Sequence, residues 1–188
     1  MLNHMRPFVR GLYALAVVCS LLGWQPLSWA QSAPATKSGD AAELPPELAP
    51  LALEAKAQFE RADYARAEEI YRQILEKAPT NLYTLSSLGV VLFRAGKTEL
   101  AEEPLKKAVA VAPKDEFSHC TLGIVYYAEA KYDDAISELT LALAINSRDA
   151  MAHYYLSLAA GQKGWKNAAE KELATARKLN PQYNDAPP

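Results

Sequence analysis

The sequence has few cysteines, few glycines and no excess of basic residues. Of its 188 residues only Cys19 and Cys120 are cysteines, and Cys19 lies in an apolar N-terminal stretch. If that stretch is removed, Cys120 cannot form an intramolecular disulfide. The 20 Lys and Arg residues are balanced by 22 Asp and Glu residues, so the basic surface typical of nucleic-acid binding is missing. We therefore expect a fold held by packing, with no nucleic acid as partner.

The first 30 residues have the pattern of a secretory signal peptide. Basic residues precede an apolar run at residues 11–23, and a Ser-Trp-Ala sequence ends at Ala30. The apolar run is shorter than the roughly 20 residues that a membrane-spanning helix needs. We expect an exported, periplasmic mature chain without stable membrane insertion. Residues 31–47, rich in Ala and Pro, predict a disordered linker.

From residue 48 onward, helical segments alternate with breaks at regular intervals, and four copies of a 34-residue unit align without a gap. The copies are residues 48–81, 82–115, 116–149 and 150–183, and residues 184–188 form a disordered tail. Position 20 of every copy is alanine, and position 8 is always small, as Ala55, Gly89, Gly123 and Ser157. Antiparallel helices approach to about 8 Å only where the facing side chains are small. Each copy is therefore predicted to form a helix-turn-helix unit, with positions 8 and 20 at the contact.

The turn inside each copy differs in one residue. Position 15 is glycine in two copies, whereas Ala62 and Ala130 stand there in the other two. A left-handed backbone would cost alanine about 1 kcal/mol. This leaves a different closure open for those two turns.

The repeat unit resembles the tetratricopeptide repeat family, whose 34-residue pattern runs Trp-x-x-Leu-Gly-x-x-Tyr and then Ala, Phe, Ala and Pro. The segment His-Cys-Thr-Leu-Gly-Ile-Val-Tyr at residues 119–126 matches it, as do Ala135, Leu139 and Ala142. The resemblance implies an all-α protein, a right-handed α-solenoid of four helix-turn-helix units with about eight antiparallel helices. It also implies a concave ligand-binding groove.

In that family, positions 2, 5, 9, 12 and 13 of each first helix line the groove, and here they are mostly apolar. The predicted groove residues are Phe59, Tyr83, Val90, Phe93, Phe117, Cys120, Ile124, Tyr127, Met151, Tyr154 and Leu158. Only Lys56 has the basic character of family members that clamp a terminal carboxylate, which disfavours that kind of ligand. Aromatic anchors instead favour an apolar or aromatic peptide or helix of a partner protein. The resemblance thus implies a scaffold for assembling envelope complexes, although each of these side chains could also pack between adjacent first helices.

His119 and Cys120 are the candidates for catalysis or metal binding, and the sequence supports neither use. His119 and His153 occupy position 4 of successive copies, on the order of 10 Å apart given helix packing distances, whereas zinc needs several ligands within about 2.3 Å. Cys120 lies about 100° further round the helix than His119, so the two side chains cannot cooperate easily. We expect no enzyme, no metal and no cofactor. Two alternatives stay open: an enzyme using Cys120 or His119, and a self-associating protein joined through its uncapped terminal repeat.

Overall fold

The computed structural model describes residues 43–184, which form eight α-helices between two short 3₁₀ turns. The turns are η1 (Pro46–Leu48) and η2 (Pro181–Asn184). The first helices of the four pairs are α2 (Ala49–Glu60), α4 (Leu82–Arg94), α6 (Glu116–Ala128) and α8 (Ala150–Gln162). The second helices are α3 (Tyr64–Lys77), α5 (Thr98–Val111), α7 (Tyr132–Ile145) and α9 (Lys166–Leu179). The expected signal peptide, residues 31–42 of the expected linker and residues 185–188 of the expected tail lie outside the described residues.

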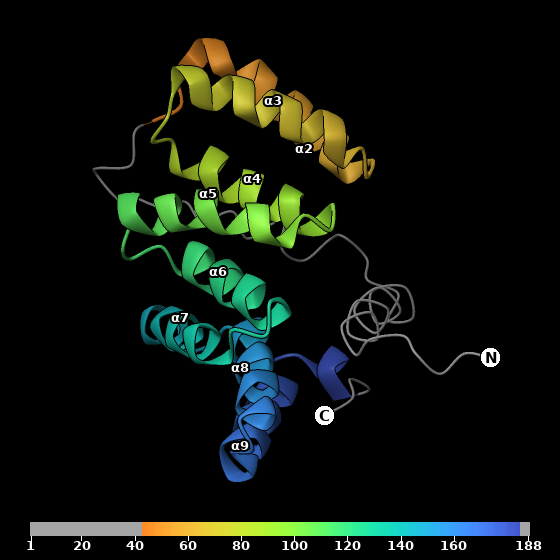
Figure 1. Cartoon of the computed structure of the whole chain (residues 1–188), viewed down its shortest axis with the longest axis vertical. Coiled ribbons are helices and arrows are strands. Elements are labelled where there is room, and N and C mark those ends of the chain that lie inside the picture. The colour runs from red at the N-terminus through yellow and green to blue at the C-terminus, as the bar shows by residue number, and fades with distance from the viewer. Residues whose placement is uncertain (1–42, 185–188) are drawn as a thin grey trace, which may run out of the picture. The chain divides into compact units, whose positions relative to one another are not determined.

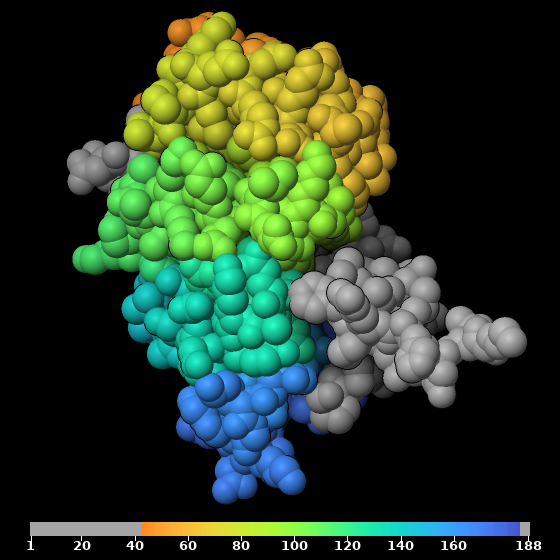
Figure 2. Space-filling model, viewed as in Figure 1, coloured from red at the N-terminus to blue at the C-terminus, as the bar shows by residue number. Residues whose placement is uncertain are grey.

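The helix pairs stack in chain order. The two helices of a pair pack against each other, and each second helix also contacts the first helix of the next pair. Figure 1 shows this order from α2 and α3 at one end of the stack to α8 and α9 at the other, and Figure 2 shows it as successive bands of colour. The predicted all-α solenoid of four helix-turn-helix units is confirmed. Because each pair contacts its chain neighbours, stability depends on repeat-to-repeat interfaces.

Small residues at position 8 do bring the two helices of a pair together. A Cβ atom on Gly123 would lie 2.7 Å from Leu139 Cγ and 3.2 Å from the Leu139 backbone nitrogen. A Cβ atom on Gly89 would meet the side chain of Leu105, the equivalent leucine. The closest neighbour of these glycines is therefore the leucine at position 24, while the alanines at position 20 are fully buried in the first three copies.

The turns inside the four copies close in the same way. Ala62 and Ala130 have φ values of 60° and 58°, and Gly96 and Gly164 both have 76°. The backbone bonds also agree, since Lys131 N donates to Tyr126 O at 2.9 Å after Ala130, and Lys97 N donates to Leu92 O at 2.9 Å after Gly96. The different closure left open for the alanine turns is not adopted, and each alanine bears a left-handed strain of about 1 kcal/mol.

The first helices of the last three copies begin at side-chain caps. Asn81, Asp115 and Asp149 occupy position 34, and each accepts a hydrogen bond from a backbone N–H in the first turn of the following helix. The distances are 2.9 Å, 2.9 Å and 2.8 Å respectively. Such caps satisfy N–H groups that have no partner inside the helix. The Asn and Asp at position 34 therefore fix where each new copy starts.

Candidate ligand-binding surface

All of the predicted groove residues lie on first helices. Phe59 is on α2; Tyr83, Val90 and Phe93 are on α4; Phe117, Cys120, Ile124 and Tyr127 are on α6; and Met151, Tyr154 and Leu158 are on α8. Because α4 contacts α6 and α6 contacts α8, the structure brings most of these residues onto helices that lie side by side.

The exposure of the predicted groove residues differs widely. Cys120 is 1% exposed, Val90 and Ile124 are 5% and 6% exposed, and Tyr154 is 8% exposed. Tyr83 is 40% exposed, and the remaining residues are partly exposed. Cys120 and Ile124 belong to the main hydrophobic core, so they also stabilise the fold. Contact of any groove residue with a ligand stays a prediction.

A row of tyrosine rings links the third and fourth copies. Tyr127 lies edge-on to Tyr155 with ring centroids 5.8 Å apart, and Tyr155 lies edge-on to Tyr154 at 5.5 Å. Tyr132 adjoins Tyr127 at one end of the row, at 5.9 Å, and Tyr183 adjoins Tyr154 at the other, at 4.6 Å. The edge-to-face and stacked pairs of this row attract one another beyond simple burial, and the Tyr127–Tyr132 pair is tilted at 51°. We call these five residues the tyrosine row.

Three members of the tyrosine row were not predicted. Tyr132 and Tyr155 lie outside the family's groove positions, and Tyr183 lies beyond the last helix. Tyr132 could have been found by comparing the copies, because Tyr64 occupies the equivalent position in the first copy. The Tyr64 ring lies 5.7 Å from that of Phe59, as the Tyr132 ring lies beside that of Tyr127. The contact of Tyr183 has no counterpart in another copy from which it could be inferred.

Acidic side chains lie beside Cys120. Burial and the neighbouring Asp149 raise the pKa of Glu116 to about 8, so this carboxyl holds a proton near neutral pH. Burial, with Asp149 as a further cause, also raises the pKa of the Cys120 thiol. A reactive thiol is accessible and has a lowered pKa. Cys120 has the opposite properties.

The two histidines have the same structural role in successive copies. His119 Nδ1 lies 2.7 Å from Glu138 Oε2, and His153 Nδ1 lies 2.6 Å from Glu172 Oε2. The second ring nitrogen of each histidine contacts a backbone carbonyl oxygen, that of Pro113 for His119, at 3.2 Å. Both nitrogens of each ring therefore have a hydrogen-bond partner within the protein. Among the residues that the structure describes, no group of three or more His, Cys, Asp and Glu could hold a metal ion.

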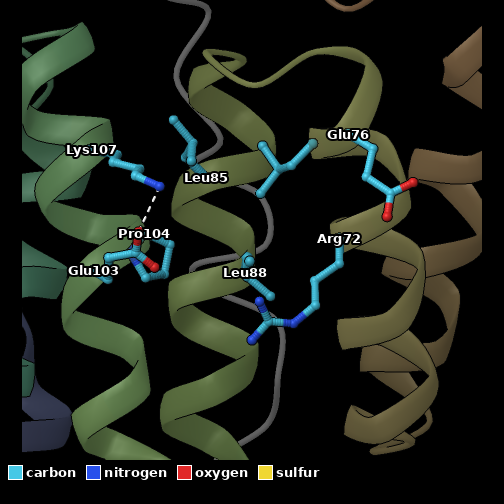
Figure 3. A pocket seen from close by; sticks show the side chains of 8 residues that line it. Arg72, Glu76, Leu85, Leu88, Glu103, Pro104 and Lys107 are labelled. Atoms are coloured by element: carbon cyan, nitrogen blue, oxygen red, sulfur yellow. Dashed lines mark ion pairs between the residues drawn. The ribbon is translucent and has the colours of Figure 1, made fainter.

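A hollow of about 350 Å³ lies between α3, α4 and α5, where no site was predicted (Figure 3). Leu85 and Leu88 of α4 line it and are almost completely buried. The rest of the lining comes from the two neighbouring helices. Helix α3 contributes Arg72, Leu75 and Glu76, and helix α5 contributes Glu103, Pro104 and Lys107. Arg72 pairs with Glu68, and Lys107 pairs with Glu103 at 2.6 Å. The lining holds two basic and two acidic side chains, so the hollow has no net charge with which to select an ionic ligand.

A membrane-spanning helix is not found in the described part of the chain. Across residues 43–184 every helix is too short or too polar to cross a bilayer.

Comparisons with known proteins agree with the repeat architecture. A family model described as the TT21 fifth ARM repeats domain matches residues 49–154, more than half of the chain. No curated protein matches in a sequence search. Among solved structures, MamA is 26% identical, with 68% of this chain and 74% of that chain covered and a TM-score of 0.64.

Two further structures show the same fold at lower identity. YrrB, titled a TPR protein with an unusual peptide-binding site, is 21% identical, with 70% of each chain covered and a TM-score of 0.64. TTC0263, a thermophilic TPR protein in Thermus thermophilus, is 22% identical, with 71% of this chain and 74% of that chain covered and a TM-score of 0.63. The chain therefore belongs to the family of the TT21 fifth ARM repeats domain and has the fold of tetratricopeptide repeat proteins.

Proposed function

We propose that this protein is a non-enzymatic scaffold whose first-helix face binds an apolar or aromatic segment of another protein. One observation carries the proposal. Phe59, Phe93 and Tyr127 occupy the same position near the ends of three successive first helices, and all three are partly exposed. A repeated row of aromatic side chains suits an elongated ligand that crosses several repeats, because aromatic anchors contribute most of the energy in such interfaces.

The comparison with YrrB supports a peptide as the ligand. That protein has the same fold and is titled as having an unusual peptide-binding site. In an array of helix pairs, neighbouring repeats can each contribute one or two side chains to an extended segment. The buried, proton-bearing thiol of Cys120 and the fully occupied ring of His119 support a role without chemistry.

We further propose that binding takes place outside the cytoplasm, in the bacterial periplasm, during the assembly of an envelope complex. The support for export is the signal-like pattern of the first 30 residues. Fractionation of the native host, with an antibody against the chain, tests this part separately. Recovery of the protein in the cytoplasmic fraction alone would contradict it.

Site-specific photo-crosslinking in the native host tests the binding surface. A benzophenone amino acid at Tyr127 should yield an adduct with a second protein, identified by mass spectrometry. The matched control is the same amino acid at Leu141, which is 45% exposed but lies on the second helix α7. Equal capture at both positions, or no capture at Tyr127, would contradict the proposal. Adducts that contain only the chain itself would favour self-association instead.

A further inference from the structure

Tyr183 departs from the repeat pattern at the C-terminal end. Its position in the fourth copy corresponds to that of Asn81, Asp115 and Asp149, each of which caps the first helix of the next copy. After α9 the described chain forms only η2 (Pro181–Asn184), so there is no helix at this point to cap. In the fourth copy the large aromatic Tyr183 therefore stands where the other copies have a small polar residue that caps the next helix.

The Tyr183 ring lies on a predicted groove residue. It stacks on Tyr154 with ring centroids 4.6 Å apart and an interplanar angle of 20°. The turn is held in place by the Arg177 Nε–H, which donates to the Tyr183 carbonyl at 3.1 Å, and by the Tyr183 N–H, which donates to Asn180 O at 3.1 Å. With this ring in place Tyr154 is only 8% exposed. A segment of the chain itself thus covers the fourth-copy end of the predicted groove.

The surroundings of Tyr183 favour an uncharged tyrosine ring. Burial raises the pKa of Tyr183, and the nearby Asp149, Cys120 and Tyr154 raise it further. Glu116 also lies close to Asp149, and this carboxylate is one cause of the raised pKa of Glu116. A ring that carried negative charge, such as phosphotyrosine, would face like charge here.

We propose that Tyr154, Cys120 and Asp149, called the tyrosine site below, form an anchor site for an unphosphorylated tyrosine side chain of a partner segment, and that Tyr183 occupies this site in the free protein. The inference rests on the proposed function, because it names the side chain that the scaffold takes from its partner. The seated Tyr183 ring is the evidence for the kind of occupant. A partner must displace η2, so its apparent affinity is the intrinsic affinity multiplied by the small fraction of molecules in which Tyr183 has left the site.

A peptide titration tests the tyrosine site without any partner. The probe is a fluorescein-labelled peptide with the sequence of residues 180–188, and fluorescence anisotropy measures its binding to the full-length chain. A tethered ring competes at an effective concentration in the millimolar range. We therefore expect the Tyr183→Ala chain to bind the peptide at least about tenfold more tightly than the unmodified chain.

Matched variants make the result specific. The Tyr183→Phe chain keeps the stacked ring and should bind as weakly as the unmodified chain. The Trp165→Ala chain loses an aromatic ring that is 50% exposed in the same copy, and it should also behave like the unmodified chain. Peptides in which the tyrosine is replaced by alanine or phosphorylated should fail to bind the Tyr183→Ala chain.

Equal binding of the peptide to the Tyr183→Ala and unmodified chains, or no binding to either, would overturn the tyrosine site. So would undiminished binding of the peptide that lacks tyrosine. Tyrosine-ring NMR of the unmodified chain is a second measurement that does not depend on the folding of a variant. Excess peptide should move the Tyr183 signal, assigned from the Tyr183→Phe chain, to the position of a free tyrosine. A signal that stays in place while peptide binds would also overturn the proposal.

Failure of this inference and failure of the proposed function give different results. Capture of a protein at Tyr127, together with equal peptide binding by the two chains, would keep the scaffold function and remove the tyrosine site. Tight peptide binding by the Tyr183→Ala chain without any capture at Tyr127 would keep the site and remove the proposed partner.

Discussion

Replacing Gly123 by alanine should destabilise the protein, although alanine is the better helix former. In a helix interior the exchange gains about 0.5–1 kcal/mol from the lower flexibility of the unfolded chain. The added Cβ atom, however, would lie 2.7 Å from Leu139 Cγ and 3.2 Å from the Leu139 backbone nitrogen. Carbon atoms in contact prefer separations of about 3.5–4.0 Å. Rotating the Leu139 side chain does not move its backbone nitrogen, so α6 and α7 must separate slightly.

Overpacking of this kind costs typically about 1–3 kcal/mol. Set against that gain, the net effect on the free energy of unfolding should be a loss of up to roughly 2.5 kcal/mol. Gly161 is the matched control, because the atom nearest to its added Cβ is Ala169 Cβ at 4.0 Å. The Gly161→Ala chain should therefore gain up to about 0.5–1 kcal/mol.

Urea unfolding followed by far-UV circular dichroism measures both variants under the same conditions. The Gly123→Ala transition should move to lower urea and the Gly161→Ala transition to higher urea, with similar slopes. If Gly123→Ala were as stable as Gly161→Ala, the close contact at position 8 would not limit residue size. The packing explanation of the repeat pattern would then be refuted.

Four further predictions test individual side chains. In a chain whose other cysteine is replaced by serine, Cys120 should react with a thiol reagent at neutral pH at least about a hundredfold more slowly when folded than in urea. The reason is that Cys120 is 1% exposed and that burial raises its pKa. Glu116, with a folded-state pKa of about 8 against an ordinary 4.5, holds a proton that the unfolded chain releases. The contribution of Glu116 to the free energy of unfolding should therefore be complete below about pH 4.5 and fall as the pH rises towards 8, by less than about 1.4 kcal/mol per pH unit because solvent screens this half-buried group. Urea unfolding of Glu116→Gln should lack this decline. Ala130→Gly should raise the melting temperature, since it removes a left-handed strain of about 1 kcal/mol. Glu138→Ile should lose about 1–3 kcal/mol in urea unfolding by leaving the buried His119 ring without its acceptor, and adding His119→Leu should restore most of that loss.

The repeat architecture could be predicted because close packing of two helices requires small residues at fixed positions of the repeat. Small residues recur at position 8, as Gly89 and Gly123 do, wherever a second helix must lie close. The start of each of the last three copies is also marked in the sequence, since an Asn or Asp such as Asp115 stands at the same position before the first helix. The capping contact joins residues three positions apart, and the small residues recur at a fixed position of every copy, so a linear pattern is sufficient to reveal both features.

The finer contacts depend on residues that are brought together by folding. The pairing of His119 with Glu138 joins two helices, and it appears in a sequence only after those helices are placed side by side. The turns at Ala62 and Ala130 show a second limit. A local strain of about 1 kcal/mol suggests another conformation, yet the packing of the two helices outweighs that strain.

Position 5 of the repeat explains why the fourth copy differs from the others. The first three copies have the small residues Ala52, Ser86 and Cys120 there, all buried and all followed by another helix pair. No helix pair follows the fourth copy within the described residues, so the larger Tyr154 can be accommodated, and its ring is covered by Tyr183. A cover that consists of one stacked ring and a short turn can leave at much lower cost than a pair of packed helices. Of the four equivalent positions, only the last can therefore open without unfolding a repeat, which is why the proposed tyrosine site is placed at the C-terminal end of the described stack.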